Sequence, residues 1–126
     1  MGVLYNWDSD AIWAATSLRG RDHFRHYPMQ ARVGVSRALM NGNIPWEHVT
    51  PSDIDAGLAP RYKVIYLPAQ LAISQDLLAK LTRFVEGGGR VVMDSPGALY
   101  DEYGLVLPTA EGALFEKLFG AELSDV

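Results

Sequence analysis

The sequence predicts an α/β fold in which four parallel strands form one open sheet, in the order 2-1-3-4, with helices on both faces. The main observation is a strand, helix and strand pattern between Tyr62 and Pro96. Its first strand is the apolar, β-branched run Lys63 to Leu67, which Pro68 closes and which has the pattern of a strand buried on both faces. A helix and a second apolar run follow directly. We therefore expect a right-handed β-α-β crossover with parallel strands.

The helix of this crossover has a start signal and a stop signal. Ser74 can act as its N-cap, and the glycines at positions 87 to 89 close it just before the apolar run Val91 to Met93. Its apolar residues form one stripe that would lie on a sheet: Leu77, Leu78, Leu81, Phe84 and Val85. A phosphate-binding loop opens a helix, whereas these glycines end one. They predict a cap containing a residue with positive φ, and no phosphate site.

The N-terminal half predicts two further strands and a long helix. Val3 to Trp7 is predicted to be the first strand, Ala11 to Ala15 a short helical segment, and Arg19 to His26 a loop. Pro28 fits the first turn of a helix that runs to about Met40, and Ile44 to Val49 supplies the second strand. The helix is amphipathic, and one of its sides carries Met29, Val33, Ser36 and Met40.

The remaining segments are connections and a last helix. Thr50 to Pro60 is rich in turn residues and can hold one helical turn after Ser52. Ser95 to Pro108 is predicted to be irregular, with a turn at the DEYG sequence. Ala110 to Phe119 has an apolar helical face that Gly120 closes.

Composition limits the possible functions. A chain of 126 residues fits one domain, residues 1–126, which we expect to be a fragment or accessory domain of a longer protein. The net charge is −4 and the eleven basic residues are scattered, so we expect no nucleic-acid partner. No apolar run approaches the roughly 20 residues of a membrane span. The absence of cysteine excludes thiol catalysis and suits a cytoplasmic location.

Polar residues follow three of the predicted strands at their carboxyl ends, where open α/β sheets bind ligands. These candidate crevice residues are Asp8, Asp10, Gln70, Asp94 and Ser95. Three carboxylates at one edge could hold Mg²⁺, as in response-regulator receivers, but Pro68 stands where a receiver needs its phosphorylated aspartate. The plain alternative is that Asp8 or Ser9 caps a helix. We expect no catalytic residue, no metal and no cofactor.

Five segments together resemble one family. They are LYNWDSD, NGNIPWEHVTP, YKVIYLPAQLAIS, FVEGGGRVVMDSP and LFEKLFGAEL, and they cover nearly the whole chain. The chain resembles the trimerisation domain of glycoside hydrolase family 42 beta-galactosidases. The resemblance implies a flavodoxin-like domain, akin in fold to class I glutamine amidotransferases without their cysteine. It also implies subunit association beside a catalytic (β/α)₈ barrel. The family's two catalytic glutamates belong to that barrel, so none is assigned to this chain.

Two functions follow as hypotheses. The first is a non-catalytic association domain of a beta-galactosidase-like glycoside hydrolase, which forms a trimer or dimer or contacts the parent barrel. The second is a small-molecule or carbohydrate-binding module, a degenerate amidotransferase-like domain, that uses the crevice. Association predicts a flat patch of exposed aromatic residues such as Trp13, Tyr27 or Tyr100, whereas binding predicts polar groups that converge in a concave pocket.

Overall fold

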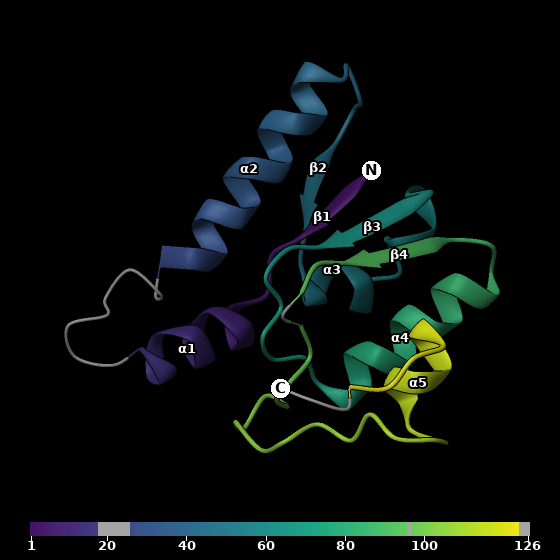
Figure 1. Cartoon of the computed structure of the whole chain (residues 1–126). Helices are drawn as coiled ribbons and strands as arrows, with labels where there is room; N and C mark the ends of the chain where they lie inside the picture. Colours follow the sequence, from purple (N-terminus) through teal and green to yellow (C-terminus); the bar gives the residue numbers. More distant parts are fainter. Residues whose placement is uncertain (18–25, 96, 124–126) are drawn as a thin grey trace.

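The predicted parallel sheet is present in the computed structural model, which describes residues 1–17, 26–95 and 97–123 (Figure 1). All pairings between the strands are parallel, and the strand order is β2-β1-β3-β4, which confirms the predicted order 2-1-3-4. The strands are β1 (Gly2–Leu4), β2 (Glu47–Val49), β3 (Val64–Leu67) and β4 (Arg90–Met93).

Helices connect these strands in the order expected of a parallel α/β fold. They are α1 (Trp7–Thr16), α2 (Tyr27–Asn41), α3 (Pro51–Asp55), α4 (Gln75–Glu86) and α5 (Leu114–Phe119), with a 3₁₀ turn at Ala59–Arg61. Within the described residues, no helix is long and apolar enough to cross a membrane.

The crossover from β3 through α4 to β4 forms as predicted. The Ser74 hydroxyl accepts a hydrogen bond from the backbone N–H of Leu77 at 3.1 Å and so caps α4. Gly88 has a φ of 94°, which confirms a positive-φ residue within the glycine run. The last helix also ends as predicted, because its C-cap, Gly120, is left-handed with a φ of 64°.

One face of the sheet carries the main core. Leu4, Ile65 and Leu67 are fully buried there, among the buried apolar residues of α3 and α4 and Phe115 of α5. In Figure 1, α4 and α5 lie together on this side of the sheet. The apolar stripe predicted on α4 is the part of this core that packs onto the sheet.

The opposite face is only partly covered, which corrects the prediction that the strand from Lys63 to Leu67 is buried on both faces. In β3, Ile65 and Leu67 are buried, but Val64 and Tyr66, which alternate with them along the strand, are partly exposed. In β4, the Val92 side chain is 44% exposed. Parallel sheets normally have both faces covered, and an apolar run does not reveal which side lacks a cover.

Several predicted element boundaries shift for local reasons. The first strand ends at Leu4 and not at Trp7, because α1 begins at Trp7. The second strand keeps Glu47–Val49 only, and the last helix starts at Leu114. The helical turn predicted after Ser52 begins at Pro51, capped by Thr50. Most of the loop predicted at Arg19 to His26 lies outside the described residues.

Candidate functional site

The predicted crevice at the carboxyl ends of the strands is crossed by hydrogen bonds within the protein. Asn6, and not Asp8 or Ser9, caps α1: its Oδ1 accepts from the backbone N–H of Asp8 at 3.2 Å. The fully buried Ser9 hydroxyl donates to the carbonyl oxygen of Ala69 at 3.2 Å and accepts from the N–H of Leu71 at 2.9 Å. Helix α1 is therefore fastened to the loop that follows β3.

The loop after β3 is also held from the end of β4. Ala69 has a left-handed φ of 48°, and its backbone N–H donates to Asp94 Oδ1 at 2.6 Å. Burial raises the pKa of the Asp94 carboxyl above its ordinary value, while the hydrogen bond from Ala69 acts in the opposite direction. Gln70 is fully buried, and its Nε2 donates to the carbonyl oxygen of Pro68 at 3.0 Å. Its Oε1 has no hydrogen-bond partner among the described residues.

The five candidate crevice residues therefore lie in different environments. Asp8 and Ser95 are exposed, Asp94 bonds to the backbone, Gln70 is enclosed, and Asp10 pairs with an arginine of α2. Within residues 1–17, 26–95 and 97–123, no group of three or more acidic or histidine side chains is placed to hold a metal ion. Binding of a ligand at this edge stays a prediction. Such a ligand would have to compete with the hydrogen bonds already made there.

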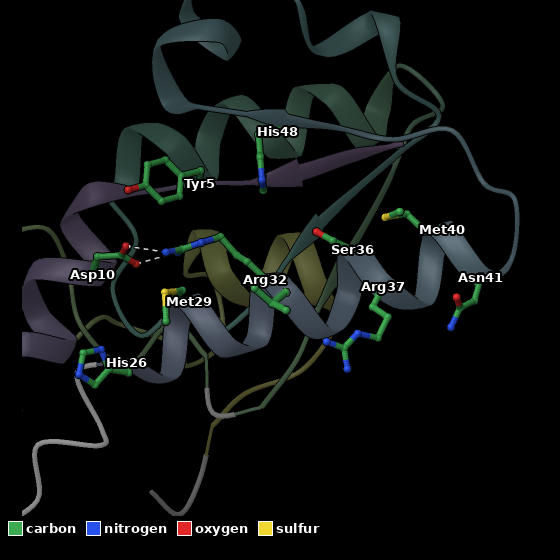
Figure 2. A pocket seen from close by; sticks show the side chains of 11 residues that line it. Tyr5, Asp10, His26, Met29, Arg32, Ser36, Arg37, Met40, Asn41 and His48 are labelled. Atoms are coloured by element: carbon green, nitrogen blue, oxygen red, sulfur yellow. Dashed lines mark hydrogen bonds and ion pairs between the residues drawn. The ribbon is translucent and has the colours of Figure 1, made fainter.

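A separate hollow lies between α2 and the partly covered face of the sheet, and we call it the α2 groove. Its volume is about 760 Å³. Val49 points into the main core whereas its neighbour His48 lines the groove, so α2 lies on the other face of the sheet. Figure 2 shows the lining side chains: Tyr5, Asp10, His26, Met29, Arg32, Val33, Ser36, Arg37, Met40, Asn41 and His48.

The floor of the α2 groove is organised by Arg32. This side chain is only 9% exposed, and it makes two hydrogen bonds of 2.9 Å to the carboxylate oxygens of Asp10. Its guanidinium carbon lies 4.4 Å from the centre of the Tyr5 ring. The paired contacts fix α2 relative to α1 and β1 (Figure 2).

The apolar side of α2 lies along this groove and is not buried. Met29, Val33 and Met40 are 53%, 51% and 66% exposed, and the buried residues of the helix are Pro28, Arg32 and Leu39. The amphipathic pattern identified the residues that share this side. It could not show that the described chain leaves half or more of each of these side chains exposed.

The aromatic residues predicted to form an exposed patch are only partly placed as expected. Trp13 is buried, and its indole N–H donates to the carbonyl oxygen of Ala69 at 2.8 Å, so its predicted exposure is wrong. Tyr27 is 39% exposed with its ring 5.1 Å from that of Trp13, and Tyr100 is partly buried. Trp7, which the sequence did not single out, is 70% exposed.

Comparisons with known proteins agree with this architecture. The whole chain, residues 1–126, matches the family described as the beta-galactosidase trimerisation domain. The chain is 25% identical over 124 residues to beta-galactosidase GanA of Bacillus subtilis, a match that covers 95% of this chain and 17% of that relative.

Solved structures show the same fold. A catalytic mutant of Gan42B, a GH42 beta-galactosidase from G. stearothermophilus, superposes with a TM-score of 0.80 at 25% identity over 98% of this chain and 17% of that one. The beta-galactosidase from Bifidobacterium adolescentis gives a TM-score of 0.75 at 20% identity over 98% of this chain and 54% of that one. The chain therefore spans a small part of the GanA and Gan42B chains. It belongs to the beta-galactosidase trimerisation domain family.

Proposed function

We propose that this chain is an accessory domain of a longer beta-galactosidase-like glycoside hydrolase and that it holds the subunits of that protein together as a trimer. The observation that carries the proposal is the uncovered apolar side of α2 beside a partly open sheet face. The family match supports it, since the family is described by trimerisation. The relatives, of which this chain spans a fraction, are beta-galactosidases.

Covering the exposed side of α2 would favour association. Full burial of a valine or methionine side chain stabilises by about 1.5–3 kcal/mol relative to exposure. Met29, Val33 and Met40 are each exposed to about half or two thirds. An occupant of the groove would therefore gain roughly 1 kcal/mol from each of them. The buried Arg32–Asp10 pair keeps the helix in place before any partner arrives.

Sedimentation velocity of the full-length protein tests this role. We expect a trimer, and we expect Val33→Asp to dissociate it because a carboxylate would enter an apolar contact. The matched control is Ala38→Asp, an exposed position on the same helix outside the groove lining, which should leave the trimer intact. A full-length protein that stays monomeric at millimolar concentration would refute the proposal.

The same proposal places catalysis outside this chain. Glycoside hydrolysis uses two carboxyl groups about 5–9.5 Å apart on either side of the scissile bond. We expect the isolated chain to release no nitrophenol from nitrophenyl galactosides. Turnover that survives repurification and disappears in Asp94→Asn would show that the strand-end edge is an active site.

A further inference from the structure

A second exposed apolar feature lies in the turn Asp101–Val106, far along the chain from α2. Three of its side chains are among the most exposed large apolar groups described: Tyr103 at 81%, Leu105 at 65% and Val106 at 80%. Isolated exposed apolar side chains are ordinary, but a contiguous group of them usually marks an interaction site. Tyrosine is also a common anchor at protein interfaces, because its ring buries a large area and its hydroxyl stays polar.

Hydrogen bonds within the turn hold it in one shape. Asp101 Oδ1 accepts from the backbone N–H groups of Tyr103 and Leu105, both at 2.9 Å. The N–H of Asp101 donates to the carbonyl oxygen of Leu105 at 2.8 Å, and Gly104 takes the positive φ of 81° that the turn needs. An isolated antiparallel bridge joins Tyr100 to Val106 at its base. The turn is therefore already ordered before any partner binds. This preorganisation lowers the entropic cost of docking.

The charges of the turn and the α2 groove are complementary. In the groove, the charge of Arg32 is balanced by Asp10, while Arg37 forms no ion pair with another described residue. In the turn, Glu102 next to Tyr103 likewise has no ion pair within the part of the chain described. Within the described residues, a cation without an ion pair thus lies beside Met29 and Val33 in the groove, and an anion without one lies beside the exposed apolar side chains of the turn.

The two features lie apart within one copy. In Figure 1, α2 extends from one side of the sheet, and the green segment after β4 that carries the turn lies at the opposite end of the view. A contact between them must join two copies, with different surfaces on each. Such a head-to-tail contact closes into a ring when the rotation between copies allows it, and three copies form the smallest ring larger than a dimer.

We propose that the Asp101–Val106 turn of one copy inserts into the α2 groove of the next copy. Tyr103 and Leu105 would cover Met29 and Val33, and Glu102 would pair with Arg37. The inference rests on the proposed trimerisation and names the two surfaces that make it. It assigns a role to the exposed turn, which the family match leaves without one.

Charge-reversal variants of the full-length protein test this contact. Sedimentation equilibrium measures the dissociation constant of the trimer for each variant. We expect Arg37→Glu and Glu102→Arg each to raise the dissociation constant at least tenfold, because each places like charges together. The double variant should return to within about threefold of the parent value, since it restores an opposite pair. Arg83→Glu makes the same charge change on an exposed position of α4, and we expect no effect. Circular dichroism checks that every variant is folded.

A crosslink gives independent evidence of the geometry. With p-benzoylphenylalanine in place of Tyr103, irradiation of a mixture of ¹⁴N- and ¹⁵N-labelled protein should join that position to the α2 peptide of the other isotope. Crosslinks to any other segment would overturn the proposal. A parent trimer that all three interface variants (Arg37→Glu, Glu102→Arg and the double variant) leave unchanged would overturn it while leaving trimerisation intact. A monomeric parent would refute both.

Discussion

Replacing each glycine of the run 87 to 89 with alanine tests how the structure ends α4. Gly87 has a φ of −75°, and an added Cβ would lie 3.4 Å from the carbonyl oxygens of Arg83 and Phe84, an ordinary contact. Gly88 has a φ of 94° with no atom within 4 Å of an added Cβ. At Gly89 the Cβ would lie 2.3–2.5 Å from ring atoms of Phe84, which is 9% exposed in the core.

These three geometries predict three different changes in the free energy of unfolding. Gly87→Ala should be neutral or stabilise by about 0.4–1 kcal/mol, because it restricts the unfolded chain without straining the folded one. Gly88→Ala should cost about 1–2 kcal/mol, because a side chain is strained at positive φ even in open space. Gly89→Ala should cost about 1–3 kcal/mol, because the buried Phe84 ring must move.

Urea unfolding followed by circular dichroism measures these differences directly. Thermal melting provides a second measurement, with a shift of about 3–5 °C for each kcal/mol in a domain of this size. Gly88→Val should be at least as costly as Gly88→Ala, since the branched side chain adds strain at the same φ. If Gly88→Ala is neutral, or if Gly87→Ala is the most damaging of the three, the assigned cap is wrong.

Three further predictions concern the polar contacts of α1 and of the loop that follows β3. Ser9→Ala should cost about 1–3 kcal/mol of unfolding free energy, because it leaves buried backbone groups without their partner. Asp10→Ala should cost about 2 kcal/mol, since it leaves the Arg32 guanidinium buried and unpaired, and adding Arg32→Met should recover part of the loss. The raised pKa of Asp94 means that its contribution to stability is present below the unfolded pKa and is lost as the pH rises through the folded pKa. Asp94→Asn should therefore gain stability relative to the parent as the pH rises from about 3 to 7.

Urea unfolding midpoints of these variants test whether the lost hydrogen bond, the unpaired charge and the raised pKa cause the predicted changes in stability. A Ser9→Ala variant as stable as the parent would show that water replaces the hydroxyl. A double variant at Asp10 and Arg32 that is no better than Asp10→Ala would show that the cost comes from packing and not from the unpaired charge. A constant difference between Asp94→Asn and the parent at every pH would contradict the raised pKa.

Local signals in the sequence were sufficient for the topology and for the ends of several helices. Ser74 and Gly120 act through neighbours a few residues away, so their capping roles can be read without the fold. The β-α-β order also determines parallel pairing, because a crossover of this length cannot form a hairpin. Five quoted segments were enough to identify the family that the comparisons confirm.

Tertiary structure alone decided what covers each surface and which polar groups are free. Periodicity showed that Met29, Val33 and Met40 share one side of α2, but their exposure depends on elements far away in the chain. The pairing of Asp10 with Arg32 spans 22 residues and has no local signal. The candidate crevice residues were predicted from the strand order. That order places them at the same edge of the sheet, but it does not determine whether their side chains contact one another. Whether Asp94 faces a ligand or the backbone N–H of Ala69 depends on the path of the loop after β3, and that path is set by long-range hydrogen bonds from Ser9 and Trp13.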